Sequence, residues 1–336
     1  MWGWLSSGLL LGWSVGANVL ANVFATAVAS RMVRFATAVK LCVIFVILGG
    51  LINGPAGMAT FGDFGGVDTL AGAFAVALAS ALTVTCMVGA GLPVSAAQTA
   101  VGALIGYRLC RDGSVGAPAQ LLLQMIVATW LCVPVLAAGT AFLIYKAVGQ
   151  ISRRLPMPLF LLDQWLRLAL LAAGCYASWA VGGNNMANVV GFYMRLDLFA
   201  PLPIGSWMIS QPRILALLGG LAISLGVVTY SRRIMLTVGR DLVRLDAMTA
   251  FIAILAEALV VDFFAHSWRL YDFTLPAIPV SLSQALVGSI VGLGLARGIQ
   301  TIQLRVLRNI VIGWVASPLI SIALAYLLLS VVLRLA

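Results

Sequence analysis

The sequence GANVLAN at residues 16–22 has a counterpart, GGNNMAN, at residues 182–188. Both septets lie inside apolar stretches, where an asparagine side chain is unfavourable unless its amide has hydrogen-bonding partners. Two septets that share this spacing of small and amide residues indicate one polar site that is built twice, once in each half of the chain.

The composition places the chain in a membrane. It has 336 residues, of which 62% are hydrophobic and 9% are charged, whereas soluble domains usually carry about 25% charged residues. The apolar runs are too long, and too free of alternation, to be strands of a membrane barrel. We therefore expect an all-α polytopic membrane protein without a separate soluble domain.

Basic residues and Gly/Pro breaks divide the chain into ten apolar runs, and we expect about 10–12 membrane segments. The runs lie near residues 3–28, 38–54, 69–90, 93–107, 119–146, 166–192, 213–230, 246–264, 278–296 and 309–333. The runs at 93–107 and 278–296 are rich in glycine and open with proline, which is typical of re-entrant or broken helices. The first run lacks the basic start of a cleaved signal, so we expect it to be retained.

The net charge of +10 comes from Lys and Arg residues in short loops, a pattern typical of positive-inside orientation. We expect a multi-pass protein of the inner (cytoplasmic) membrane. The basic residues are scattered rather than gathered on one face, so we expect no nucleic-acid partner. Arg108 and Arg297 could attract anions to an entrance or act as positive-inside anchors, and the sequence leaves both roles open.

Two further motif pairs recur in the same order as the septets: LPVSAAQTAVGALIG (92–106) with IPVSLSQALVGSIVG (278–292), and WLCVP (130–134) with WVASP (314–318). Three ordered matches indicate a duplicated unit, with repeats at 1–160 and 161–336. Duplication with paired Gly/Pro-interrupted segments is typical of secondary transporters that are built from inverted-topology repeats. A duplicated helix bundle without a transport role is the alternative.

The motifs GANxxAN and GxNxMANxxG, each followed by PVSxxQxxVGxxxG, resemble the inorganic phosphate transporter family of phosphate/sulfate permeases. The resemblance covers essentially the whole chain. It is most similar to the short sulfate-permease branch, which has a comparable NNxAN septet and a Gln in the second re-entrant motif. The resemblance implies an inverted-repeat transporter that moves a tetrahedral oxyanion by coupling to sodium or protons.

The sequence departs from the family signature, which normally reads Gly-x-Asn-Asp in both septets and Pro-Val-Ser-Thr-Thr-His in both re-entrant motifs. Val19 and Asn185 stand at the aspartate positions, and Gln98 and Gln284 stand at the histidine positions. Every carboxylate that the family places in the septets is therefore missing.

The missing carboxylates favour sulfate over phosphate. Hydrogen phosphate carries a proton at neutral pH and benefits from an acceptor, whereas sulfate can only accept hydrogen bonds. We expect Pro93 and Pro279 in the first turns of the re-entrant helices, so that Ser95 and Ser281 lie beside unpaired N–H groups at the positive ends of the helix dipoles. The expected substrate-binding residues are Asn18, Asn22, Ser95, Gln98, Asn184, Asn185, Asn188, Ser281, Ser283 and Gln284.

The same loss weakens the expected sodium site, so we expect protons as the coupling ion and keep sodium as the alternative. The candidate proton carriers are Glu257 and Asp262, because carboxylates inside membrane segments are functional candidates. Glu257 aligns with Ser80 of the first repeat. The competing interpretations are a structural hydrogen bond for Glu257 and an interfacial position near Arg269 for Asp262. We expect His266, the sole histidine, at the membrane edge.

The sequence contains no HExxH, no GxSxG and no paired carboxylates at catalytic spacing, so we expect no enzyme. The five cysteines are spread singly, and we expect no metal and no cofactor. The expected partners are an inorganic oxyanion and the lipid bilayer, and a homodimer stays open. The leading expectation is proton-coupled sulfate uptake by alternating access. The alternatives are a sodium- or proton-coupled phosphate permease and a non-transporting, anion-sensing membrane homologue.

Overall fold

The computed structural model describes residues 2–89, 94–154, 158–205, 207–232, 246–271, 273–298 and 304–335. Helix dominates this part of the chain, because a helix satisfies its backbone polar groups within its own segment and can therefore lie in an apolar environment. The long helices are α1 (Trp2–Ala29), α2 (Phe35–Gly65), α3 (Leu70–Gly89), α4 (Ala96–Asp112), α5 (Ala117–Arg154), α6 (Leu159–Val190), α7 (Gln211–Thr229), α9 (Ala247–Ala265), α10 (Leu282–Arg297) and α11 (Leu304–Leu335).

Within the described ranges, eight helices are long and apolar enough to cross a membrane. The two long helices outside that set are α4, with 17 residues, and α10, with 16 residues. At about 1.5 Å per residue, both are shorter than the roughly 30 Å hydrocarbon core of a bilayer. The multi-pass, all-α architecture is confirmed, and the two segments that the sequence marked as unusual are the short ones.

The short helices begin later than predicted. A serine caps each of them, and Pro279 lies two residues before the cap Ser281. The expected place of Pro279 in the first helical turn is therefore wrong, because the serine side chain performs the capping. Pro93 lies outside the described residues. Helix α2 runs well past the predicted end at residue 54, because Pro55 is accommodated inside it, and it stops at Gly66, which has a positive φ of 59°.

Two antiparallel hairpins and a short 3₁₀ helix, η1 (Gly191–Tyr193), join the long helices. The hairpin of β1 (Leu202–Ile204) and β2 (Trp207–Ile209) follows η1, and the hairpin of β3 (Trp268–Leu270) and β4 (Phe273–Leu275) connects α9 to α10. The Ile278 N–H donates to the Phe264 carbonyl at 2.9 Å, which joins the segment after β4 to the end of α9.

The short helix of each half packs on a long helix of the other half. Helix α4 packs on α11, and its counterpart α10 packs on α5. A Cβ at Gly102 would overlap the Pro318 carbonyl, and a Cβ at Gly288 would overlap the Pro134 carbonyl. The pairs α1–α7 and α6–α2 repeat this relation. Such backbone approach through small residues is the packing on which helices rely in lipid, where burial of apolar surface gives no driving force between them.

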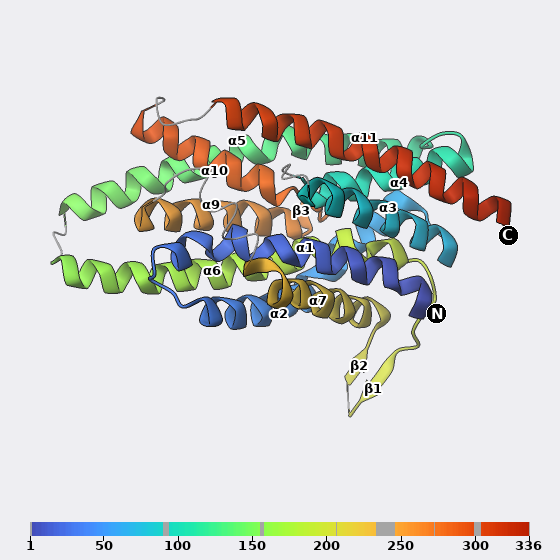
Figure 1. Ribbon diagram of the computed structural model, residues 1–336, viewed down its shortest axis with the longest axis horizontal. Helices are drawn as coiled ribbons and strands as arrows, with labels where there is room; N and C mark the ends of the chain where they lie inside the picture. Colours follow the sequence, from blue (N-terminus) through green and yellow to red (C-terminus); the bar gives the residue numbers. More distant parts are fainter. Residues whose placement is uncertain are drawn as a thin grey trace.

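The helix pairs α3–α4 and α9–α10, which correspond in the two halves, lie at opposite ends of the molecule (Figure 1). In Figure 1, α3 and α4 lie toward the end that carries both chain termini, whereas α9 and α10 lie toward the other end. The division at residue 160 falls two residues inside α6, whose first residue is Leu159. The interleaved packing means that neither half buries its interior alone.

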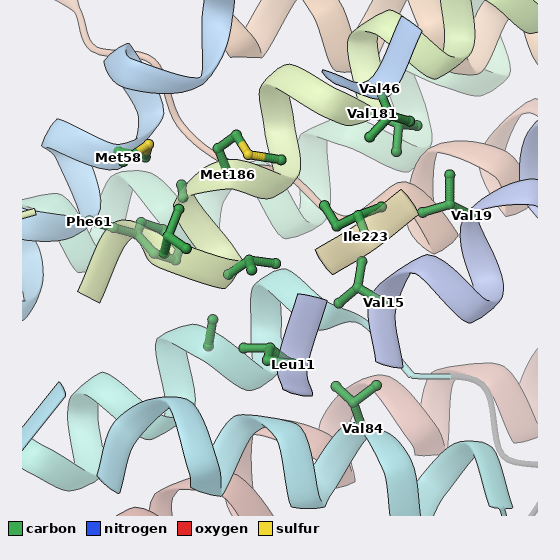
Figure 2. Close-up of a cluster of buried hydrophobic side chains, with 14 of the residues drawn as sticks. Leu11, Val15, Val19, Val46, Met58, Phe61, Val84, Val181, Met186 and Ile223 are labelled. Atoms are coloured by element: carbon green, nitrogen blue, oxygen red, sulfur yellow. The ribbon is translucent and has the colours of Figure 1, made fainter. Parts of the chain in front are cut away.

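The buried interior lies where α1, α2, α3, α6 and α7 meet. Figure 2 shows side chains from these helices gathered in one cluster, with Val15 and Val19 of α1 close to Ile223 of α7. Met186 of α6 packs against Gly50 and Gly54 of α2. This packing fixes the helices that carry the two septets, and hence fixes the position of the asparagines.

Candidate anion site

The short helices α4 and α10 begin in the same way. The Ser95 Oγ accepts a hydrogen bond from the Gln98 N–H at 3.3 Å, and the Ser281 Oγ accepts one from the Gln284 N–H, also at 3.3 Å. Both serines are buried, with exposed fractions of 2% and 1%. A helix start keeps further unpaired N–H groups and the positive end of the helix dipole. Each half therefore supplies one buried, serine-capped helix N-terminus.

A cavity of about 50 Å³ lies between these helix starts and the septets. One water molecule needs about 10–15 Å³ of such space, so the cavity can take a few waters or one small ion. Its lining residues are Val15, Asn18, Val19, Asn22, Val84, Val94, Ser95, Ala96, Ala97, Asn185, Val280, Leu282 and Ser283. None of these residues is charged, so any charge in the cavity is stabilised by dipoles and hydrogen-bond donors.

Five of the ten predicted binding residues line this cavity: Asn18, Asn22, Ser95, Asn185 and Ser283. The Ser283 Oγ lies 3.1 Å from the Ser281 Oγ and accepts a hydrogen bond from the Trp314 ring N–H at 3.1 Å. Ser281 thus reaches the cavity through Ser283, and the structure brings both re-entrant helix starts to one place.

Four amide atoms of the predicted residues are buried without a hydrogen-bond partner among the described residues: Gln98 Oε1, Asn185 Nδ2, Asn188 Oδ1 and Gln284 Oε1. Buried polar atoms in proteins are normally paired, so these four amide atoms are available to water or to a ligand. Because a half-turn about the terminal bond exchanges the oxygen and nitrogen of an amide, each glutamine can present either an acceptor or a donor.

Asn184 has a different role from its counterpart Asn18. The Asn184 amide donates to the Val280 carbonyl at 2.9 Å and accepts from the Val280 N–H at 2.7 Å, so it holds the segment that leads into α10. Asn18 makes one long hydrogen bond, 3.4 Å to the Ser14 carbonyl of its own helix, and lines the cavity. Asn188 donates to the Asn185 Oδ1 at 3.1 Å, which takes one of the two lone pairs of that oxygen.

The two candidate proton carriers lie outside the cavity lining. Glu257 is 1% exposed, and neither of its carboxylate oxygens has a hydrogen-bond partner among the described residues. Asp262 accepts hydrogen bonds from Asn53 and Tyr176. His266, which the sequence places only at a membrane edge, contacts Asp262 as well. The helical spacing of four residues between Asp262 and His266 is the signal that could have found this contact.

A matched pair of ion pairs was missed at the level of sequence. Arg111 at the end of α4 pairs with Asp68 before α3, and Arg297 at the end of α10 pairs with Asp246 before α9. Arg111 and Arg297 occupy equal positions in the two PVS repeats, which is the signal that could have found them.

These ion pairs shift the titration of both aspartates. The Arg111 guanidinium lowers the pKa of Asp68. Burial opposes ionisation of Asp246, but hydrogen bonds from Thr249 and Arg297 outweigh burial and lower the pKa of Asp246. Arg108 instead donates to the Phe64 carbonyl at 2.7 Å at the end of α2. Its guanidinium therefore anchors that helix end.

Comparison with known proteins concerns the family and the fold of the chain. The sequence pattern of the phosphate transporter family matches residues 15–325. The chain belongs to this family. It is a multi-pass membrane protein with the fold of a transporter, and among the described residues no three His, Cys, Asp or Glu side chains are grouped so that they could hold a metal ion.

Relatives in the family carry the names of both phosphate and sulfate permeases. A Methanocaldococcus jannaschii protein named "Putative phosphate permease" is 27% identical over 94% of this chain and 92% of its own length. The sulfate permease CysP of Bacillus subtilis is 25% identical over 97% of this chain and 86% of its own length. A solved structure, "The sodium-dependent phosphate transporter", superposes with a TM-score of 0.79 at 22% identity and covers 99% of this chain and 98% of its own. That likeness shows the fold.

Proposed function

We propose that the protein is a secondary active permease that takes up sulfate together with protons by alternating access. The observation that carries this proposal is the cavity between two serine-capped helix N-termini, whose described lining contains amides and hydroxyls but no carboxylate. A doubly charged oxyanion that can only accept hydrogen bonds matches a site of this kind.

The details of the septets support sulfate over phosphate. Hydrogen phosphate needs an acceptor for its own O–H group. Val19 offers none, and the Asn185 Oδ1, which already accepts one hydrogen bond from Asn188, is a neutral amide oxygen and a weaker acceptor than a carboxylate. The site therefore lacks a carboxylate acceptor at both positions where the family signature has aspartate.

Phosphate is the second candidate, and one observation favours it. The oxygens Gln98 Oε1, Gln284 Oε1 and Asn188 Oδ1 are buried acceptors without partners among the described residues. None of the three residues is in the cavity lining, so they would accept a phosphate O–H only after their side chains turn toward the cavity. The names of several relatives point the same way. The two substrates must therefore be compared directly.

Proton coupling is proposed on the basis of Glu257. An isolated ionised carboxylate is very costly to bury, so a buried and unpartnered Glu is accommodated in its neutral form. A side chain that is neutral when enclosed, and that can ionise once a conformational change exposes it to water, can carry a proton across. The opposite placement of α3–α4 and α9–α10 supports an inverted repeat, and hence an exchange of access between the two membrane faces.

We place the protein in the cytoplasmic membrane, supported by its short basic loops. A homodimer remains a prediction, and neither the cavity nor the proton carriers require one. The non-transporting, anion-sensing alternative predicts binding of the anion without flux.

The test is uptake of labelled sulfate and labelled phosphate by purified protein in liposomes, under an imposed pH or sodium gradient. We expect sulfate to accumulate when the outside is acidic and phosphate to compete weakly. The Glu257→Gln variant should keep sulfate exchange but lose at least about tenfold of the pH-driven accumulation, because a single-site carrier without its proton transports passively. The matched control is Ser80→Ala at the equivalent position, which should remain coupled.

Three results would contradict the proposal. Phosphate that displaces sulfate at equal concentration would reverse the choice of substrate. Sulfate uptake that responds to a sodium gradient and not to a pH gradient would contradict proton coupling. Tight binding without flux would identify an anion sensor.

A further inference from the structure

The Asp262 carboxylate lies where α9 meets α6 and α2. Its Oδ1 accepts from the Asn53 amide of α2 at 3.3 Å, and its Oδ2 accepts from the Tyr176 hydroxyl of α6 at 3.0 Å. In the register that aligns Glu257 with Ser80, the first half has Thr85 at this place, and Thr85 pairs with the Ser14 hydroxyl at 2.9 Å. The first half thus has a neutral contact where the second half has a carboxylate with two donors.

His266 lies beside this carboxylate, on the more exposed side. Its Nδ1 lies 2.8 Å from the Asp262 carbonyl and 4.0 Å from the Asp262 Oδ1. The His266 side chain is 43% exposed, whereas that of Asp262 is 19% exposed. The His266 ring thus lies within ion-pair distance of the Asp262 carboxylate, on its more exposed side, but hydrogen-bonds to the Asp262 backbone and not to the carboxylate.

The groups that face Asp262 are few. Tyr176 comes from α6, the non-ionisable Asn53 comes from α2, and His266 follows on its own chain segment. Helices α1, α5 and α10 also pack on α9, but no described side chain of theirs reaches hydrogen-bond or ion-pair distance of Asp262. The described Arg side chains that form ion pairs do so with Asp68, Asp112 and Asp246. Among the described residues, His266 is the one basic side chain within ion-pair distance of Asp262, and it carries charge only when protonated.

A continuous chain of contacts links this group to the anion cavity. Asn53 lies against Gly183 of α6, where an added Cβ would approach the Asn53 Cβ to 2.8 Å. Gly183 directly precedes Asn184, which holds Val280, and Asn185, which lines the cavity. A change in how Asn53 bonds to Asp262 is thus transmitted to two residues of the site through packed backbone rather than through a flexible loop.

We propose that Asp262, with His266 beside it and Tyr176 and Asn53 as its donors, binds the proton that is linked to anion binding. The inference rests on the proposed function only in requiring that the cavity binds an oxyanion. One proton moves from water on the exposed side to a carboxylate oxygen of Asp262, which is itself 19% exposed, as the anion enters, and it leaves to the same side once the site is empty again, so the proton carried across the membrane is the one proposed for Glu257. No other bond is made or broken.

Electrostatics gives this linkage its direction. An ionised Asp262 repels a dianion in the cavity, and the intervening protein screens this repulsion less than water would. Protonation removes the repulsion, so the protonated protein binds the anion more tightly, and by reciprocity the bound anion favours protonation. Glu257 belongs to the transport step proposed above and is not required for this binding-linked proton.

The test measures sulfate affinity of the purified protein from pH 5.5 to 8, together with proton uptake on sulfate addition in weak buffer. Wild-type affinity should fall with rising pH by up to about tenfold per unit, the limit for one linked proton. Asp262→Asn should keep the low-pH affinity, lose the pH dependence and take up no proton. Glu257→Gln should behave like the wild type in this assay.

Tyr176→Phe provides a second variant in case Asp262→Asn does not fold. The tyrosine hydroxyl donates to the ionised carboxylate, so its removal should move the affinity transition to higher pH. Tyr193→Phe is the matched control, because the Tyr193 hydroxyl bonds to Ser7 and to the Trp4 carbonyl and should leave the transition unchanged.

The outcomes separate the two proposals. A wild type that binds neither sulfate nor phosphate at any pH overturns the proposed function and this inference together. Binding whose pH dependence survives in Asp262→Asn, or disappears only in Glu257→Gln, overturns this inference and leaves the anion site in place.

Discussion

The two halves of the chain agree at the anion cavity and differ at the titratable groups. Ser95 and Ser281 cap equivalent helices with the same hydrogen bond. By contrast, Glu257 and Asp262 stand where the first half has Ser80 and Thr85. In the function proposed above, the duplicated positions supply the surface that holds the anion. The positions that are not duplicated supply the groups proposed to take up a proton.

The halves also differ in how firmly the segment before each short helix, α4 or α10, is held. Asn184 fixes the backbone of Val280 with two hydrogen bonds, whereas Asn18 faces the cavity and bonds within its own helix. The second half therefore gives the site a fixed wall. In the first half, the matching asparagine keeps an amide that can contact the ligand.

The largest effect is expected from glycines at which the halves interlock. Gly102→Ala and Gly288→Ala should each lower stability by about 1–3 kcal/mol, because the new Cβ would overlap a backbone carbonyl of the facing helix. Gly139→Ala is the control, since its Cβ would meet nothing within 4 Å. Thermal unfolding in detergent measures the effect. If only one of the two glycines matters, the packing of the halves is not reciprocal.

Asn184→Ala and Asn18→Ala should separate support from binding. Asn184→Ala leaves both polar groups of the buried Val280 backbone unpaired, which costs about 1–3 kcal/mol, and should lower both the melting temperature and sulfate affinity. Asn18→Ala should weaken sulfate binding with little change in melting temperature. Calorimetric titration and thermal unfolding of both variants provide the measurements. Equal losses of stability in the two variants would contradict the assignment of a structural role to Asn184 and a binding role to Asn18.

The smallest effect is expected from two ion pairs, Asp68–Arg111 beside α3 and α4 and Asp246–Arg297 beside α9 and α10. The pKa values of Asp68 and Asp246 are lowered in the folded protein, so the ionised forms stabilise the fold. This contribution is complete above the ordinary aspartate value of about 3.9 and disappears as pH falls through the lowered values. Because both pairs are largely exposed, each contributes less than about 1 kcal/mol.

Melting curves of Asp68→Asn and Asp246→Asn against pH test this prediction. Both variants should melt slightly below the wild type at pH 7, and the three curves should converge at acidic pH. A difference that persists below pH 3 (about one unit under the ordinary aspartate value) would assign the effect to something other than the charge.

Sequence alone predicts those features that depend on local pattern. The ten apolar runs correspond to the ten long helices, and the repeated PVS motif places Ser95 opposite Ser281 because equal motifs fold into equal helix starts. The absent septet carboxylates are visible at Val19 and Asn185 in the same way. These features need only periodicity, repeat register and capping chemistry.

The features that sequence does not predict are contacts between distant segments. The clamp of Asn184 on Val280 joins residues 96 positions apart, and the pairing of Asp262 with Asn53 joins residues 209 positions apart. Each depends on the close approach of helices. Small residues such as Gly183 permit this approach, but their presence in the sequence does not predict which helices will meet. Two local features also differ from prediction. Serine capping starts α4 and α10 later than the prolines indicate, and α2 continues through Pro55 although proline usually ends a helix.

The central claim is that both halves build one anion site, and sulfate titration of Ser95→Ala and Ser281→Ala tests it most directly. Each variant loses a helix cap worth about 1 kcal/mol and a donor beside the cavity. We predict about tenfold weaker binding for each, with Ser224→Ala of α7 as the unaffected control. Wild-type affinity in either serine variant would contradict the claim, because the site would then belong to one half alone.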